Sequence, residues 1–241
     1  MSRRRILLFG DSLTQQGFDV AQRGWASSVA NAYIRRADVI NRGFSGYNSR
    51  WCLSLAPTVM TELGISEAQE GEPPSVSLVT VLLGSNDLAE GTSQGTSLDE
   101  YKRNLASLVE FFTRYTRAAS RVVLMTPPPV DAAKWAEYCG SPNRKLAASE
   151  AYAQASLEVA SASGAIGIDL WTAFTSKEGW ERFLSDGLHM APEGNALIFD
   201  ELMRSIASKA PDVAPDGAGM PLDAPLWDEI DPDDPEADFN P

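Results

Sequence analysis

The chain has 241 residues, of which 44% are hydrophobic, and a formal net charge of −13 at pH 7. It contains no apolar run near the roughly 20 residues that a membrane-spanning helix needs, and no basic surface is evident that could meet phosphates, so we expect neither membrane nor nucleic-acid binding. Residues 211–241 hold ten Asp or Glu and no Lys or Arg, so the rest of the chain carries only −3.

Short apolar runs rich in Val, Ile and Leu predict five strands. They are residues 5–10, 37–43, 75–84, 121–126 and 165–170. Nearly continuous hydrophobicity, in place of alternation, is typical of a strand that is buried on both faces. The sequence therefore predicts a parallel sheet at the centre of the fold.

Helical spacing appears between these runs. Residues 98–115 carry apolar side chains three and four positions apart, and Pro192 suits the first position of a second helix. Strands that alternate with helices predict an α/β fold in which helices cover both faces of the sheet. We expect residues 1–210 to form this domain.

Residues 211–241 form an acidic, Pro-rich extension with seven of the fifteen prolines. Apolar side chains are spaced along it, namely Met220, Leu222, Leu226, Trp227 and Ile230. We interpret it as a strap that docks on the domain or on a partner chain. After Asp231, a loose acidic tail is an equally good interpretation.

The cysteine content favours a reducing, cytoplasmic location. The chain has two cysteines, Cys52 and Cys139, and no N-x-S/T glycosylation sequon. A disulfide between them is not expected. Three arginines at the N-terminus precede an apolar run that is too short for a signal peptide.

Chemically useful residues follow several of the predicted strands. Ser12 follows the first strand, and Gly43 and Gly46 follow the second. Asn86 follows the third strand, and Asp186 and His189 come some distance after the fifth. Open parallel sheets bind ligands at the carboxyl ends of their strands. We therefore expect these residues to meet at one edge of the sheet.

This set matches the requirements of acyl transfer. A serine becomes a good nucleophile when a base takes its proton, and His189 is the only histidine in the chain. Asp186, three positions earlier, could orient the imidazole from the same helical turn. Backbone N–H groups of Ser12 and Gly46 and the Asn86 amide could bind an oxyanion. Each residue alone also has a structural explanation without catalysis. A lone histidine is usually a surface or core residue, and glycines often mark turns.

Four ordered blocks carry a resemblance to a known family. The segments "FGDSLTQ", "NRGFSGYNSRW", "LLGSND" and "DGLHMAPEGN" resemble the blocks of the SGNH hydrolases, also called the GDSL esterase/lipase family. Within that family, "TPPPVDAAKWAEYC" and "PLWDEIDPDDP" are similar to segments of the isoamyl acetate-hydrolysing esterases. The likeness extends from about Arg5 to Pro235.

The resemblance implies a three-layer α/β/α sandwich with a five-stranded parallel sheet of flavodoxin-like strand order. It implies a serine esterase with a triad of Ser12, Asp186 and His189 and an oxyanion hole of Ser12, Gly46 and Asn86. Short acetate-type esters are the implied substrates, and a homodimer is the implied assembly. Sugar O-acetyl groups, thioesters and lysophospholipids are alternative substrates, and a non-catalytic binding protein is a weaker alternative.

Several further assignments stay open at this stage. Gly43 could replace Gly46 as the oxyanion donor. Phe44, Tyr47 and Trp51 could line an acyl pocket or simply pack in the core. Ser93 lies at the centre of "GTSQG", which matches the G-x-S-x-G nucleophile elbow, but no strand leads into it.

No metal or cofactor is expected. The sequence has no Cys/His cluster with zinc-ligand spacing and no G-x-G-x-x-G fingerprint after a strand. The acidic run at residues 231–236 lacks the glycine and distal glutamate of an EF-hand loop.

Overall fold

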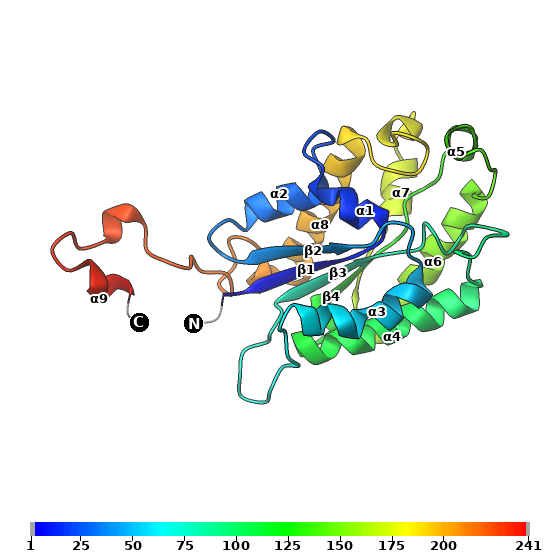
Figure 1. Cartoon of the computed structure of the whole chain (residues 1–241). Helices are drawn as coiled ribbons and strands as arrows, with labels where there is room; N and C mark the ends of the chain where they lie inside the picture. The colour runs from blue at the N-terminus through cyan, green and yellow to red at the C-terminus, as the bar shows by residue number, and fades with distance from the viewer. Residues whose placement is uncertain (1–2, 240–241) are drawn as a thin grey trace.

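A five-stranded parallel sheet forms the centre of the computed structural model, which describes residues 3–239 (Figure 1). The strand order is β2-β1-β3-β4-β5, and every neighbouring pair runs parallel. The strands are β1 (Arg5–Gly10), β2 (Asp38–Gly43), β3 (Leu78–Leu82), β4 (Val122–Met125) and β5 (Ile166–Ile168). This is the flavodoxin-like order, so the predicted fold class is confirmed.

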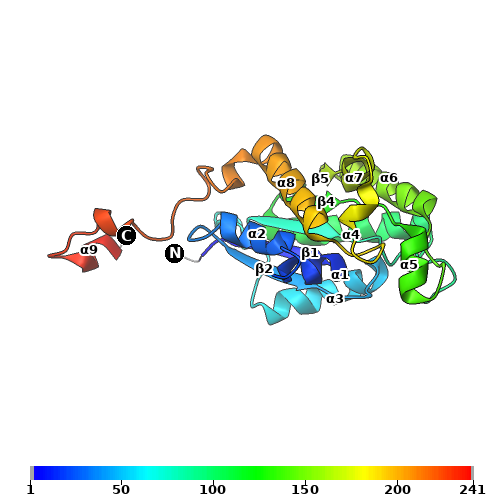
Figure 2. The same cartoon turned by 90° about the horizontal axis from the view of Figure 1, so that it is seen from above.

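Helices cover both faces of the sheet, as two views of the molecule show (Figures 1 and 2). One layer contains α1 (Ser12–Gln15), α2 (Trp25–Ala32), α7 (Leu170–Thr175) and α8 (Pro192–Lys209). The other layer contains α3 (Ser49–Glu62), α4 (Leu98–Thr116) and α6 (Leu146–Ser163). A further helix, α5 (Ala132–Cys139), follows β4.

Alternate side chains of β1 enter two separate cores. Ile6 and Leu8 pack in the core that contains α2 and α8, whereas Leu7 and Phe9 pack in the core that contains α3 and α4. All four are at most 1% exposed. A strand placed between two cores must be apolar on both faces, which explains why its sequence shows no alternation.

The predicted helices agree closely with the observed ones. The helix predicted over 98–115 is α4, and the Ser97 hydroxyl accepts a hydrogen bond from the Glu100 N–H at its start. Arg117 ends it in the left-handed conformation, with φ +66°. Pro192 is the first residue of α8, as predicted. The strand predicted over 75–84 is shorter, because only Leu78–Leu82 pairs with its neighbours.

The C-terminal extension divides into two parts by its contacts. Met220 is fully buried, and Asp223 pairs with Arg3, just ahead of β1. After residue 225 the chain projects away from the body and ends in α9 (Pro235–Phe239), with Trp227 85% exposed (Figures 1 and 2). The first part is therefore a docked strap, while docking of the second part on a partner chain stays a prediction.

Two observations bear on the general properties of the chain. No helix within residues 3–239 is both long enough and apolar enough to cross a bilayer. Both cysteines are free thiols: Cys52 is buried in the core beneath α3, and Cys139 is exposed at the end of α5.

Candidate active site

Ser12, His189 and Asp186 form one hydrogen-bonded row at the carboxyl end of β1. Ser12 is the first residue of α1, and the Asp11 carboxylate caps this helix by accepting the Leu13 N–H at 2.9 Å. The His189 Nε2 atom lies 3.0 Å from the Ser12 Oγ atom. The His189 Nδ1 atom lies 2.7 Å from the Asp186 Oδ2 atom. Ser12 and His189, which are 177 positions apart in the sequence, are thus in direct contact.

A closed turn, and not a helix, brings Asp186 and His189 together. Residues 185–189 form bends between the bridge partners Leu184 and Met190. The Asp186 Oδ1 atom accepts the backbone N–H groups of Leu188 at 2.9 Å and of His189 at 2.8 Å. The expectation of a shared helical turn was wrong, since Gly187 at φ +94° takes the chain out of helical geometry.

The hydrogen bonds of this turn keep the Asp186 carboxylate ionised. Burial by itself raises the pKa of the Asp186 carboxyl. The bonds from the His189 ring and from the two backbone N–H groups outweigh burial and lower that pKa to about 2. A charged Asp186 at 2.7 Å favours a proton on His189 Nδ1, which leaves Nε2 free to accept one from Ser12.

Ser12, Gly46 and Asn86 each bring a hydrogen-bond donor to one cavity. The backbone N–H groups of Ser12 and Gly46 are engaged by no other described residue, and both residues line one cavity of about 310 Å³ together with Asn86 and His189. Gly46 has φ +81°, a conformation that favours glycine. The Gly43 N–H, by contrast, already donates to Asn41 Oδ1 at 2.9 Å, so Gly46 is the better of the two candidate donors.

Asn86 is held by hydrogen bonds in the loop after β3. One Nδ2 hydrogen donates to the Tyr47 carbonyl at 2.8 Å, which leaves the second for another acceptor. The next residue, Asp87, is buried and accepts hydrogen bonds from the Ser49 N–H and the Thr96 hydroxyl. Burial raises the pKa of the Asp87 carboxyl, and these bonds lower it only in part. Asp87 thereby ties the start of α3 and the loop before α4 to the loop that carries Asn86.

The other residues that line the cavity were not among the candidate site residues of the sequence analysis. They are Ser45, Gln94, Trp135, Cys139, Ser141, Asn143, Arg144 and Leu188. Trp135 and Cys139 lie on α5, and Ser141, Asn143 and Arg144 lie between α5 and α6. The stretch "TPPPVDAAKWAEYC", which was noted only for its family likeness, supplies Trp135 and Cys139. Nothing in the sequence around Arg144 marks it as a site residue.

Phe44, Tyr47 and Trp51 lie outside the lining of this cavity. They form a row of ring contacts that continues from Phe9 in the core, with centroid distances of 6.1, 5.5 and 5.9 Å. Phe44 packs against the core that contains α3 and α4. Tyr47 is 37% exposed. Contact of these three residues with a substrate stays a prediction.

Ser93 does not have the surroundings of a nucleophile. It is exposed on a loop and follows bends and turns, with no strand running into it. Both ring nitrogens of His189, the only histidine, are engaged by Asp186 and Ser12. The G-x-S-x-G match therefore has neither the strand nor the base that an elbow serine needs.

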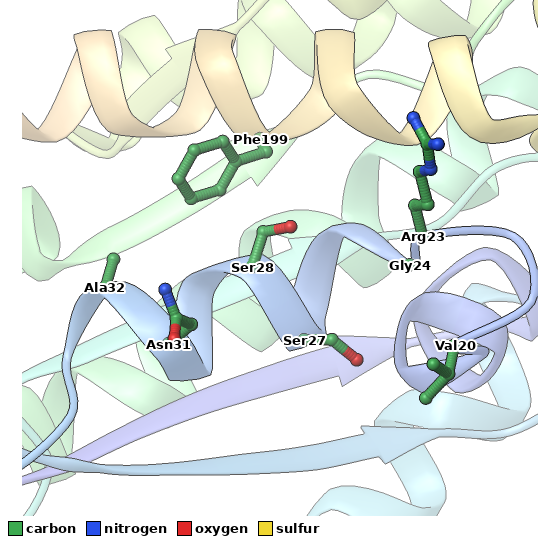
Figure 3. Close-up of a pocket in the computed structure, with 8 residues that line it drawn as sticks. All are labelled: Val20, Arg23, Gly24, Ser27, Ser28, Asn31, Ala32 and Phe199. Carbon is green, nitrogen blue, oxygen red and sulfur yellow. The ribbon is translucent and has the colours of Figure 1, made fainter.

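A second hollow, of about 480 Å³, lies between α2 and α8 (Figure 3). Val20 and Arg23 from the preceding loop, Ser28 and Asn31 from α2, and Phe199 from α8 surround it. It contains none of the candidate site residues. Within residues 3–239, no group of three or more His, Cys, Asp or Glu side chains could hold a metal ion.

Comparisons with known proteins identify the family. The model of the GDSL-like Lipase/Acylhydrolase family matches residues 8–197. The chain is 36% identical over 234 residues to the human isoamyl acetate-hydrolyzing esterase 1 homolog, covering 94% of this chain and 88% of that protein. It is also 36% identical over 252 residues to a GDSL esterase/lipase of Arabidopsis thaliana, covering 100% of this chain and 99% of that protein.

A solved structure shares the fold. The lipase/acylhydrolase from Enterococcus faecalis superposes with a TM-score of 0.65 at 24% identity and covers 85% of this chain and 96% of its own. The family match covers every candidate catalytic residue from Ser12 to His189. The chain is therefore a carboxylic ester hydrolase that belongs to the GDSL-like lipase/acylhydrolase family.

Proposed function

We propose that this enzyme hydrolyses short-chain, acetate-type esters through an acyl-enzyme formed on Ser12. The observation that carries the proposal is the row in which His189 Nε2 lies 3.0 Å from Ser12 Oγ and His189 Nδ1 lies 2.7 Å from Asp186 Oδ2. Ser12 attacks the ester carbonyl while His189 takes its proton. Asp186 stabilises the imidazolium that forms.

The remaining steps of acylation and the hydrolysis of the acyl-enzyme use the same groups. The oxyanion of the tetrahedral intermediate accepts hydrogen bonds from the Ser12 N–H, the Gly46 N–H and the Asn86 amide. As the intermediate collapses, the alcohol leaves with the proton from His189. A water molecule, deprotonated by His189, then attacks the acyl-enzyme and releases the acid and Ser12.

The size of the cavity supports a small substrate. Its volume of about 310 Å³ is at the lower end of the range for ligand pockets, which is roughly 300–1,000 Å³. Relatives named isoamyl acetate-hydrolyzing esterases, such as the human protein at 36% identity, support an acetyl group as the acyl part. We expect the hydrolysis rate to fall as the acyl chain lengthens beyond butyrate.

The polar cavity wall favours a second candidate substrate. Ser45, Gln94, Ser141 and Asn143 offer hydrogen-bonding groups that a plain aliphatic alcohol would not use. An acetylated sugar would use them, so sugar O-deacetylation is the alternative. A panel with isoamyl acetate, a methyl glycoside carrying one acetyl group, and p-nitrophenyl esters from acetate to octanoate separates the two by kcat/KM.

Serine replacement tests the mechanism. We expect Ser12→Ala to lower kcat on p-nitrophenyl acetate by about 10⁴- to 10⁶-fold, because the nucleophile is lost. Ser93→Ala is the matched control and should leave kcat unchanged. A serine-reactive phosphonate should label Ser12 in the wild-type enzyme, located by peptide mass. Retained activity in Ser12→Ala would contradict the mechanism, and a loss confined to Ser93→Ala would favour the elbow serine.

A further inference from the structure

Arg144 is a buried cation in the wall of the active-site cavity. It belongs to the loop that joins α5 and α6, and it is only 3% exposed. Its Nε donates to the Ser85 carbonyl at 2.8 Å, Nη1 to Asn143 Oδ1 at 3.1 Å, and Nη2 to Asn86 Oδ1 at 2.9 Å. The guanidinium also lies over the Trp135 ring, 4.7 Å from its centroid. The contact with Asn86 links it directly to the proposed oxyanion hole.

The charges of Asp11 and Asp186 act on the guanidinium from a distance, but neither carboxylate forms an ion pair with it. Within residues 3–239, none of the ion pairs includes Arg144. Burial of an unpaired charge is costly, so a fold that retains one needs a reason for it. The reaction supplies an anion in the same cavity when the tetrahedral intermediate forms. The hydrogen bond from Nη2 to Asn86 Oδ1 connects the guanidinium to the amide that faces this anion.

We propose that Arg144 is a positioning residue of the oxyanion hole, which fixes the Asn86 amide with an Nδ2 hydrogen towards the cavity and strengthens that donor. This inference rests on the proposed role of Asn86. Arg144 itself acts through Asn86.

The chemistry of the guanidinium decides how the Asn86 amide is turned. A guanidinium has only donors, so the atom of Asn86 that faces Nη2 must be the oxygen. Gln94 Nε2 donates to the same oxygen at 3.2 Å, but an amide also has an acceptor and could serve either orientation. If the Asn86 amide were reversed, its N–H groups would face Arg144 and its oxygen would face the Tyr47 carbonyl. Arg144 therefore disfavours the reversed orientation of the Asn86 amide, in which Oδ1 and not Nδ2 would face the oxyanion.

The same contact strengthens the donor. A hydrogen bond from a cation to Oδ1 draws electron density away from Nδ2, which makes the remaining N–H a stronger donor. Lysine could not reproduce this arrangement, because one ammonium cannot match the planar geometry that reaches Ser85, Asn143 and Asn86 together.

A double-mutant cycle between Arg144 and Asn86 tests the proposal. The variants are Arg144→Met, Asn86→Ala and the double variant, each assayed for kcat and KM on p-nitrophenyl acetate. We expect Asn86→Ala to lower kcat by about 10²-fold or more, and Arg144→Met by about 10- to 100-fold with little change in KM. In the Asn86→Ala background, Arg144→Met should lower kcat by less than about threefold, because the effect of Arg144 on kcat passes through Asn86.

Inhibition by a small alkyl boronic acid gives a second readout, because it forms a tetrahedral anionic adduct on the serine. Its affinity should fall in Arg144→Met roughly in proportion to kcat. Arg114→Met is the matched control: Arg114 also lies over an aromatic ring, Phe111 at 4.8 Å, but it is outside the cavity. This control should keep wild-type kcat and boronic acid affinity.

The outcomes separate the two proposals. Additive effects of Arg144→Met and Asn86→Ala, or a change confined to KM, would overturn the role of Arg144 while leaving the proposed function intact. An unchanged kcat in Asn86→Ala would overturn the oxyanion role on which both depend. If thermal unfolding shows that Arg144→Met does not fold, Arg144→Lys, which keeps the charge and most of the volume, replaces it in the cycle with the same expectations.

Discussion

Two aspartates next to the reacting groups have pKa values that are shifted in opposite directions. Asp186 accepts hydrogen bonds from the His189 ring and from two backbone N–H groups, and its pKa is lowered to about 2. Asp11 is completely buried, and its Oδ2 atom has no hydrogen-bond partner among the described residues. Burial raises the pKa of the Asp11 carboxyl to about 7. The carboxylate that supports the imidazole is thus charged, while the one beside the nucleophile is partly neutral near pH 7.

The burial of Asp11 predicts a particular dependence of stability on pH. The Leu13 N–H and the charges of His189 and Arg144 lower the pKa of the Asp11 carboxyl, and Asp87 raises it, but burial dominates. In the unfolded chain its pKa is about 3.9. Between about pH 4 and pH 7 the folded state holds a proton that the unfolded state lacks, so this group lowers stability as pH rises through that range.

We therefore expect Asp11→Asn to gain stability relative to the wild type as pH rises from 4 to 7. The gain has a limit of about 1.4 kcal/mol per pH unit and levels off above pH 7. Urea unfolding of both proteins at half-unit pH intervals measures it. A difference that stays constant over this range would show that Asp11 is ionised throughout in the folded enzyme.

At the scale of the elements, the sequence predicted those features that depend on local pattern. The strands β1, β3 and β4 could be found because nearly all of their residues are buried and apolar. The edge strand β2 is only partly buried, and its apolar pair Val39 and Ile40 contacts one core on each face. The helices α4 and α8 could be found from apolar spacing, and Pro192 marked the first position of α8. The candidate triad could be located because its members follow strand ends, where a parallel sheet gathers them.

Features that depend on tertiary contacts could not be predicted. Arg144 becomes part of the site only because the fold brings the end of β3 and the segment after α5 together around it. The turn at 184–190 is closed by Asp186 and by a bridge, neither of which has a periodic signature. The placement of Phe44 and its neighbours depends on which side of the loop after β2 faces the core.

Gly187 sets the position of the turn that carries the acid and the base. Its φ of +94° is strained for other residues, and an added Cβ would lie 2.4 Å from the backbone nitrogen of Trp135 at the start of α5. The Gly187 carbonyl also accepts the Asp131 N–H at 3.0 Å. A side chain at this position must push the turn away from α5 and move His189 relative to Ser12.

We expect Gly187→Ala to lower kcat by about 10²-fold, the cost of misplacing a catalytic group by roughly 1 Å. It should also destabilise the fold by about 1–3 kcal/mol through backbone strain. Gly64→Ala is the matched control, because Gly64 has φ +62° with open space around it. That control should lose about 1 kcal/mol of stability and no activity. Equal kinetics in the two variants would show that the turn tolerates displacement.

At the scale of the whole molecule, the active site and the docked strap lie at opposite ends of the strands. The cavity forms where the strands end, whereas the docked strap meets Arg3 ahead of β1 and Arg35 before β2. The Tyr33 hydroxyl donates to the Val213 carbonyl at 2.7 Å, and Met220 is buried in the core that contains α2 and α8. The strap, residues 211–225, therefore completes one core of the domain.

Truncation at two positions separates the strap from the projecting segment. A chain that ends at residue 225 keeps the burial of Met220 and the bonds from Arg35 to the Ala224 and Pro225 carbonyls. Its free energy of unfolding should lie within about 0.5 kcal/mol of the full-length value, since it loses mainly exposed residues. A chain that ends at residue 210 exposes the core beneath Met220 and Val213 and should lose at least about 3 kcal/mol. Chemical unfolding of the three chains tests this, and equal stability of the two truncated chains would show that the strap contributes nothing to the fold.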